Sequence, residues 1–231
     1  MSSSAEAPPS VEGRARSMRL PRVARRNQLL GAAREVFVAQ GYHAAAMDDI
    51  AERAGVSKPV LYQHFPGKLE LYLALLDQQC EIMVGKIRAA LDSTHDNKQR
   101  VAATMDAYFD FVEHETGAFR LVFESDLTNE PAVRERVADA QLECSRLISE
   151  VIAEDTGLPH EEAMMLAVGL TGISQVTARY WLASGSPVSR EKASELISQL
   201  AWRGIARFPL GPGVPDRPAK DGGDGGGRDA G

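Results

Sequence analysis

The sequence has few cysteines and no long apolar run. Only two of its 231 residues are cysteines, Cys80 and Cys144, and their spacing fits neither a redox pair nor a metal site. No apolar run approaches the roughly 20 residues that a membrane-spanning helix needs, and no apolar stretch follows the N-terminal segment as it would in a signal peptide. We therefore expect a cytoplasmic protein with reduced thiols and no membrane partner.

The sequence signatures of enzymes and metal sites are also missing. There is no G-x-S-x-G sequence, no phosphate-binding Gly-Lys loop and no H-E-x-x-H sequence. The five histidines are scattered without the spacing of metal ligands. We therefore expect no catalytic residue, no metal and no resident cofactor, and hence a protein that is not an enzyme.

What the sequence does contain is an uneven distribution of charge. Residues 1–70 carry ten Lys/Arg and seven Asp/Glu, whereas the remaining residues carry 16 and 25. Six arginines and no acidic residue lie between Arg14 and Arg26. A basic N-terminal segment on an acidic protein indicates that a polyanion would bind at this end, although charge alone fits a solvated, disordered tail equally well.

Apolar residues recur with a helical period through the middle of the chain. This pattern predicts an all-α fold with a small N-terminal three-helix unit and a larger C-terminal helical bundle. About nine helices are expected, at 22–40, 47–54, 57–65, from Gly67 to beyond Ile87, and at 97–115, 118–125, 131–154, 160–184 and 189–207.

The second and third of these helices, joined by Gly55-Val56, form a helix-turn-helix, which presents its second helix to the major groove of DNA. Leu61 and Phe65 are expected to anchor that helix on its neighbours. Polar and small side chains on the open sector can bond base edges or phosphates of double-stranded DNA, the expected partner. The predicted DNA-binding residues are Arg22, Arg26, Ser57, Lys58, Pro59, Val60, Tyr62, Gln63, His64 and Lys68, the last of them as a phosphate contact. The alternative is a helical hairpin with a solvated polar face.

Residues 37–76, FVAQGYHAAAMDDIAERAGVSKPVLYQHFPGKLELYLALL, resemble the TetR family of transcriptional regulators. The matching positions are Phe37, Gly41-Tyr42, Ile50-Ala51, Ala54-Gly55-Val56-Ser57, Leu61-Tyr62, His64-Phe65 and Lys68. The chain departs from the family where Ala45-Ala46 stands in place of the usual Ser or Thr. A capping bond of about 1 kcal/mol and one phosphate contact are therefore expected to be absent.

A longer resemblance adds AYFDFVEHE and ARYWLASGSPVS, and is to the actinobacterial FasR-like regulators of fatty-acid synthesis genes. It implies a DNA-binding regulator whose effector is long-chain acyl-CoA and which forms a homodimer through its last two long helices. The expected division of the chain is a disordered basic leader over 1–18, a DNA-binding domain over 19–67, a ligand-sensing and dimerisation domain over 68–210, and a disordered Gly/Pro tail over 211–231.

Bulky apolar side chains are concentrated in the helices predicted at 97–115 and 118–125. They fit an ordinary core, but in a regulator with a lipid effector they would line an apolar tunnel. The predicted ligand-binding residues are Met105, Phe109, Val112, Phe123, Leu166 and Leu170, with Arg120 beside the phosphates of CoA.

The helix predicted at 160–184 is apolar on nearly all sides from Met164 to Ile173. A helix without a polar face must be buried all round. With the helix at 189–207 it is therefore expected to form half of a four-helix dimer interface.

Two other functions remain open on the sequence. Asp106, Asp110 and Glu113 share a helix face, which favours a regulator of efflux or drug-response genes with an aromatic pocket for cations. The second alternative is an α-helical enzyme or lipid carrier, which the missing catalytic motifs and the arginine-rich segment oppose.

Overall fold

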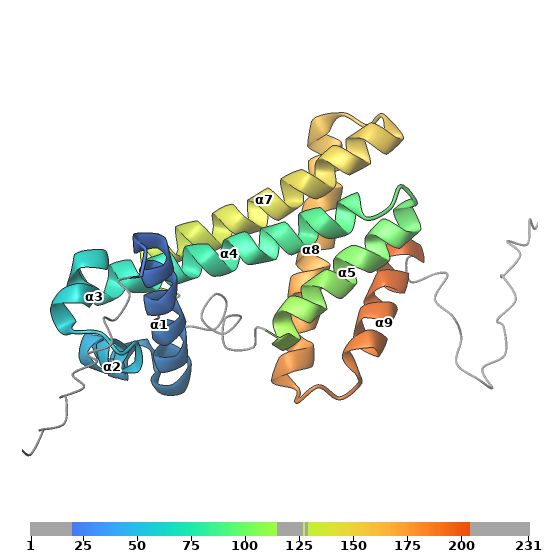
Figure 1. The fold of residues 1–231 in the computed structure, drawn as a ribbon. Coiled ribbons are helices and arrows are strands. Elements are labelled where there is room, and N and C mark those ends of the chain that lie inside the picture. Colours follow the sequence, from blue (N-terminus) through green and yellow to red (C-terminus); the bar gives the residue numbers. More distant parts are fainter. Residues whose placement is uncertain (1–19, 115–126, 128, 204–231) are drawn as a thin grey trace, which may run out of the picture. The chain divides into compact units, whose positions relative to one another are not determined.

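In the computed structural model, residues 20–114, 127 and 129–203 are described, and every regular element among them is an α-helix, as predicted (Figure 1). The predicted helix at 118–125, the leader and the tail lie outside the described residues. The helices are α1 (Arg22–Ala44), α2 (Met47–Arg53), α3 (Lys58–His64), α4 (Lys68–Asp92), α5 (Asn97–His114), α7 (Pro131–Thr156), α8 (His160–Ala183) and α9 (Arg190–Arg203).

The chain divides into two compact units. The first, which we call the N-terminal unit, comprises Met1–Gln79 and Arg120–Arg136. The second comprises Cys80–Phe119 and Val137–Gly231, and we call it the sensor unit after the role expected from the sequence for residues 68–210. Helix α4 therefore begins in the N-terminal unit and ends in the sensor unit.

The core of the N-terminal unit is formed by the apolar faces that the helical period predicts. Buried residues from α1, α2, α3 and the residue that follows α3 include Leu29, Phe37, Ile50, Leu61 and Phe65. On the first turns of α4, Leu71, Tyr72, Leu75 and Leu76 are buried, whereas Leu69 and Leu73 are only partly covered. Pairs of adjacent residues therefore form the buried face of this part of α4.

Two glycines shape the chain where the short helices begin and end. Gly41 has φ 77° and ψ 165° and breaks α1 at the predicted end of its first part. Gly55, with φ 63°, follows α2 in the left-handed region that favours glycine. The helical bonding ends there, and the chain enters α3 after two further residues.

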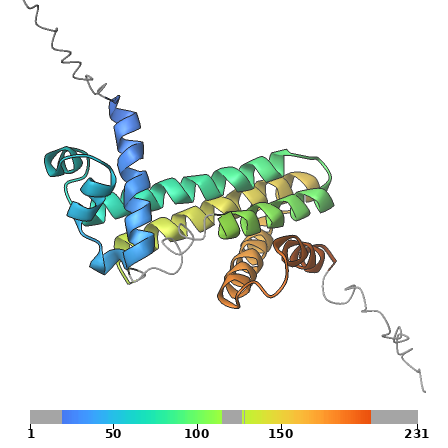
Figure 2. The ribbon, with the colours of Figure 1, turned by 60° about the horizontal axis from the view of Figure 1, so that its bottom comes forward.

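The sensor unit is built around α5, which packs against both α8 and α9 (Figures 1 and 2). Met105, Tyr108, Phe109, Phe111 and Val112 are all buried, so α5 is covered on several sides. Phe111 is among the most deeply buried of them.

Helix α8 has one buried and one exposed face, both apolar. Ala163, Ala167, Ser174, Ala178 and Trp181 are buried. Met165, Val168, Val176 and Tyr180 are exposed, with Met165 at 75% and Tyr180 at 71%. The expectation that α8 is buried on all sides is therefore not met within one chain.

Candidate functional site

Helix α3 presents one face to solvent and anchors the other. Leu61, together with Phe65 just past the helix, is buried, as predicted. The remaining side chains of this segment lie on the accessible side. Ser57, Lys58, Pro59, Tyr62 and Gln63 are exposed, and Val60 and His64 are half-buried. A tyrosine that is 48% exposed among residues able to donate and accept hydrogen bonds suits a nucleic-acid surface.

Lys58, at the start of α3, is held by an acidic residue of α2. Its Nζ atom donates to Asp48 Oδ2 at 2.5 Å. This hydrogen bond and the carboxylate's charge raise the pKa of Lys58, so the side chain is a cation at neutral pH. The pair fixes the side chain beside the helix start instead of leaving it extended.

Neither short helix has a side-chain cap. Ser57 occupies the position before α3, but its hydroxyl makes no capping bond. Ala46 occupies the equivalent position before α2, where the expected absence of a cap is confirmed. Asp48 and Asp49 in the first turn of α2 instead place negative charge near its N-terminus, where it interacts favourably with the helix dipole.

Basic residues from the start of α1 surround His64. Burial lowers the pKa of His64, and the charges of Arg22, Arg26 and Arg25 lower it further. The imidazole is thus uncharged at neutral pH. The Arg26 guanidinium lies 4.5 Å from the centre of the Phe65 ring. The structure therefore brings the predicted Arg22 and Arg26 to the end of α3.

Lys68, predicted to bind phosphate, has internal partners. Its Nζ atom donates to the carbonyl oxygens of Tyr42 at 2.8 Å, His43 at 3.2 Å and Ala45 at 2.9 Å. It also lies 4.6 Å from the centre of the Tyr42 ring. An ammonium has three N–H donors, so a phosphate contact would compete with these bonds. The geometry gives Lys68 a positioning role between α4 and the chain that joins α1 to α2.

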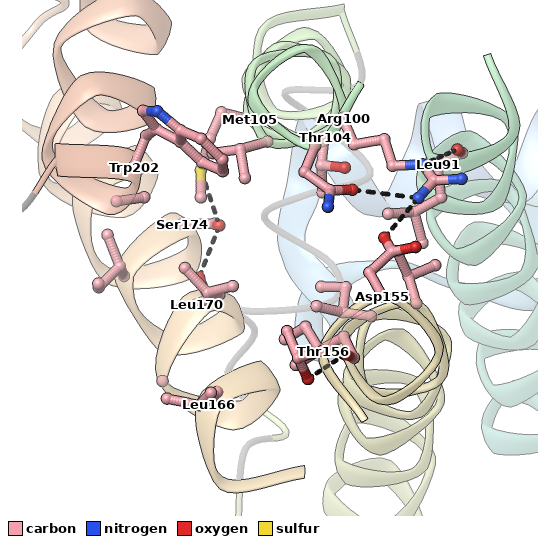
Figure 3. A pocket seen from close by; sticks show the side chains of 18 of the residues that line it. Leu91, Arg100, Thr104, Met105, Asp155, Thr156, Leu166, Leu170, Ser174 and Trp202 are labelled. Atoms are coloured by element: carbon pink, nitrogen blue, oxygen red, sulfur yellow. Dashed lines mark hydrogen bonds and ion pairs between the residues drawn. The ribbon is translucent and has the colours of Figure 1, made fainter. Parts of the chain in front are cut away.

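The sensor unit contains a cavity of about 550 Å³ enclosed by helices α4, α5, α7, α8 and α9 (Figure 3). Its lining is apolar over most of its length, with a polar group of side chains at one end. The apolar lining includes Leu91, Val101, Met105, Ile148, Val151, Ile152, Met165, Leu166, Leu170, Ile173 and Trp202, and the polar end includes Asn97, Arg100, Asp155 and Thr156.

Three of the predicted ligand-binding residues line this cavity: Met105, Leu166 and Leu170. Phe109 and Val112 do not line it and are buried in the core. The Phe109 ring packs edge-on against Trp181 with 5.7 Å between centres. Phe123 and Arg120 lie outside the described residues. The helical period identified a buried face on α5 but not which residues of that face line the cavity.

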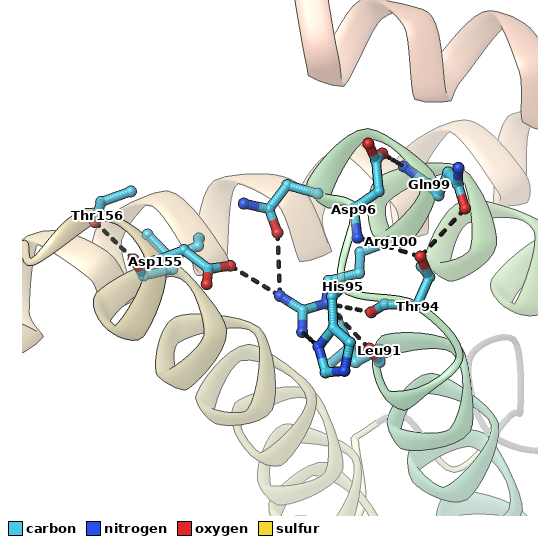
Figure 4. A network of polar contacts seen from close by, with 10 residues as sticks. Leu91, Thr94, His95, Asp96, Gln99, Arg100, Asp155 and Thr156 are labelled. Atoms are coloured by element: carbon cyan, nitrogen blue, oxygen red, sulfur yellow. Dashed lines mark hydrogen bonds and ion pairs between the residues drawn. The ribbon is translucent and has the colours of Figure 1, made fainter.

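Arg100 organises the polar end of the cavity, and the sequence analysis missed it (Figure 4). Its guanidinium donates to the carbonyl oxygens of Leu91 at 3.2 Å and Thr94 at 2.8 Å, and to the carboxylate of Asp155 at 2.8 Å. One side chain thus joins the end of α4, the loop to α5 and the last turns of α7. In the sequence, nothing around this single arginine indicates such a role.

The acidic face of α5 is neutralised by basic residues from other helices. Arg190 of α9 pairs with Asp106 at 2.5 Å and with Glu113 at 3.2 Å. Lys86 of α4 pairs with Asp110 at 2.7 Å. The acidic face is therefore occupied by ion pairs within the chain, which removes the feature that favoured a pocket for drug-like cations.

Among residues 20–114, 127 and 129–203, no group of three or more His, Cys, Asp or Glu is arranged to hold a metal ion. Within the same residues, no helix is both long enough and apolar enough to cross a membrane.

Comparison with known protein families gives two matches that together cover most of the chain. Residues 29–75 match "Bacterial regulatory proteins, tetR family", and residues 86–216 match "Tetracyclin repressor-like, C-terminal domain". The chain is 50% identical over 198 residues to the HTH-type transcriptional activator FasR of Mycolicibacterium smegmatis, covering 86% of this chain and 90% of the relative.

Solved structures with the same fold include a TetR-like transcriptional regulator from Rhodococcus sp. RHA1. It is 26% identical, with a TM-score of 0.66 over 82% of this chain and 100% of that one. The regulator FadR from Bacillus subtilis, solved with stearoyl-CoA, is 18% identical, with a TM-score of 0.66 over 78% and 98% of the two chains. At that identity the second likeness concerns the fold alone.

The bonds of Lys68 predict that its charge stabilises the N-terminal unit. Lys68→Met should lower the free energy of unfolding by about 2 kcal/mol, because three carbonyl oxygens lose a charged donor. Urea unfolding followed by circular dichroism measures this. Lys192→Met, at an exposed lysine paired with Glu195, is the control and should change stability by less than about 0.5 kcal/mol. Equal effects of the two substitutions would contradict the positioning role.

Proposed function

Because the chain belongs to the TetR family of bacterial transcriptional regulators, we propose that it is a dimeric regulator of fatty-acid metabolism genes. In this proposal, long-chain acyl-CoA is the effector. Binding of the effector in the sensor unit and of a palindromic operator by the N-terminal unit are energetically coupled, so that each changes the affinity for the other. A regulator of this kind acts in the cytoplasm, where the chromosome lies.

The observation that carries this proposal is the cavity of about 550 Å³ in the sensor unit. Its volume falls within the roughly 300–1,000 Å³ of small-molecule sites in proteins. A long apolar lining with polar groups at one end fits a ligand with an apolar chain and a polar head. An acyl thioester has this distribution of chemistry, whereas a compact aromatic cation does not.

The similarity to FasR supports fatty-acid metabolism genes as the targets. The chain resembles FasR-like regulators over its N-terminal unit and over the sensor unit, where an effector would bind. Similarity in the sensor unit is the informative part, because DNA-binding units are shared by regulators with unrelated effectors. The alternative of a regulator of efflux genes has no support, because the acidic residues that favoured it, Asp106, Asp110 and Glu113, form ion pairs within the chain.

The exposed side chains of α3 are the proposed DNA-reading surface. Tyr62 and Gln63 stand where they can reach base edges, and Lys58 and the α1 arginines supply positive charge toward phosphates. The DNA-binding domain proposed from the sequence, residues 19–67, contains all of these groups. Residues 68–210 are the proposed domain for sensing and dimerisation.

The exposed apolar face of α8 is the proposed dimer interface. Val168, Val176 and Tyr180 lie on it, and Val176 is 67% exposed in a single chain. A second copy packed on this face by a two-fold axis would bury it and give the four-helix arrangement with α9. The burial that the sequence demands for α8 would then be completed between chains.

For DNA binding, we expect Tyr62→Ala to lower the affinity for the operator by tenfold or more, since a lost base-edge or phosphate contact costs about 1–3 kcal/mol. Fluorescence anisotropy with operator and unrelated DNA measures the effect. Val38→Ala is the control, because Val38 of α1 has nearly the same exposed fraction, 47%. A Tyr62→Ala protein that binds operator as tightly as the Val38→Ala protein would exclude α3 as the reading helix.

For dimerisation, Val176→Asp should give a monomer at micromolar concentration, because it buries a carboxylate in an apolar interface. Light scattering after size-exclusion chromatography measures the mass. Leu142→Asp is the control at an exposed apolar residue of α7 and should leave the dimer intact. Should Val176→Asp remain dimeric, the interface lies elsewhere.

For effector binding, Leu170→Trp should fill the cavity and abolish the response to acyl-CoA without changing operator affinity in its absence. In the unmodified protein, long-chain acyl-CoA should change operator affinity by roughly 5- to 150-fold. Mobility shifts with free CoA and a detergent of matched hydrophobicity are the reagent controls. Leu142→Trp, at an exposed residue outside this cavity, is the protein control. A response to detergent equal to that of acyl-CoA would favour a non-selective pocket.

A further inference from the structure

The lining of the large cavity contains one positive and one negative side chain, and these two are paired. Among the described residues that line it, Arg100 of α5 and Asp155 of α7 are the only ones with charged side chains. The Nη1 atom of Arg100 donates to Asp155 Oδ2 at 2.8 Å. The two charges offset each other, so a ligand in the cavity meets no unpaired cation among these residues.

The other donors of the Arg100 guanidinium are also committed to the protein. Besides its bonds to two backbone carbonyls, Nη1 donates to Asn97 Oδ1 at 3.1 Å, and Nη2 lies 3.3 Å from His95 Nδ1. Figure 4 shows these partners around the guanidinium. The Arg100 side chain is only 15% exposed, against 35% for Asp155. An anionic ligand would therefore have to displace Asp155 to form a bidentate pair with Arg100.

This ion pair lies at the end of the cavity that is open to solvent in a single chain. Asp155 is close to the end of α7, and α8 begins after a short loop, so Asp155 is near the first turns of α8. Met165 and Leu166 on those turns line the cavity and are exposed. Toward the other end, Met105 and Ser174 are buried and hydrogen-bonded to each other at 3.1 Å. An acyl chain that enters tail first therefore leaves its head beside Arg100 and Asp155.

The charge of the head distinguishes the two forms of a fatty acid. A free fatty acid ends in a carboxylate, which would lose part of its hydration and stand beside the carboxylate of Asp155 without a cation of its own. A CoA thioester instead places an uncharged thioester and the amides of pantetheine at this point, and its phosphates lie farther out. Uncharged groups need only single hydrogen bonds, and the side-chain amide of Asn97 has N–H donors of that kind.

We infer that Asp155 is a specificity-determining residue: by neutralising Arg100, it makes the cavity select acyl chains with an uncharged head and reject free fatty acids. Without Asp155, the same arginine would form a site for a fatty-acid carboxylate. The inference rests on the proposed function, since it assigns the residue that restricts the effector to the thioester.

The test compares three ligands with the same acyl chain in the full-length protein: stearoyl-CoA, S-stearoyl pantetheine and stearate, each below its critical micelle concentration. Isothermal titration calorimetry gives the dissociation constants. The unmodified protein should bind both thioesters, and stearate at least about tenfold more weakly. In Asp155→Asn, affinity for stearate should rise about tenfold to a hundredfold, the range of one charge-assisted hydrogen bond. Affinity for the thioesters should change by less than about threefold.

Two further variants show whether the gain depends on Arg100. Glu154→Gln removes the same charge from the neighbouring residue of α7, which is exposed and does not line the cavity, and should leave stearate affinity unchanged. Adding Arg100→Gln to Asp155→Asn removes the cation. This double variant should lose the gain for stearate and still bind S-stearoyl pantetheine, which also shows that its sensor unit is folded.

The outcomes separate this inference from the proposed function. Stearate affinity that is unchanged in Asp155→Asn, or raised equally by Glu154→Gln, would overturn the role of Asp155 and leave the effector assignment intact. Binding of S-stearoyl pantetheine to the unmodified protein as weak as that of stearate would overturn it as well, because the phosphates of CoA would then carry the selectivity. An unmodified protein that binds neither thioester would contradict the proposed function itself.

Discussion

Burial of α5 is the constraint on which the sensor unit depends. This helix packs against α8 and α9, and its aromatic and aliphatic side chains are almost wholly removed from solvent. It nevertheless carries Arg100, Thr104 and Tyr108, whose polar atoms must be satisfied inside the protein. Arg100 meets this requirement with backbone carbonyls and Asp155, whereas the two hydroxyls have no hydrogen-bond partner among the described residues. The shape and polarity of the cavity follow from where these groups lie along one helix.

A comparable constraint governs the N-terminal unit on a smaller scale. Its short helices lack side-chain caps, so the geometry between them depends on longer-range bonds. Gln28 of α1 donates to the carbonyl oxygen of Ala54 at 2.8 Å, and Lys68 of α4 holds the chain that joins α1 to α2. The exposed face of α3, the proposed DNA-reading surface, is thus oriented by groups outside α3.

Most of the fold could be predicted from the sequence, because the helical period and the glycines at 41 and 55 mark the helices directly. The apolar anchors Leu61 and Phe65 and the uncapped start of α2 could also be read from local sequence. Partners between helices could not be predicted. The three carbonyl partners of Lys68, the core position of Phe109 and the pairing of Arg190 with the acidic face of α5 all depend on which helices meet. Periodicity shows which face of a helix is buried but not which other helix packs against that face.

The central claim is that an acyl chain lies in the sensor cavity, with its far end at the buried side chains of Thr104, Met105 and Ser174. A crystal structure of the protein with a long-chain acyl-CoA that carries bromine on its terminal carbon tests this claim directly. The anomalous signal of bromine marks the end of the chain without depending on the rest of the ligand. We expect one peak per chain in contact with these three side chains. A peak on the exposed face of α8, or near the polar end at Arg100, would contradict the account.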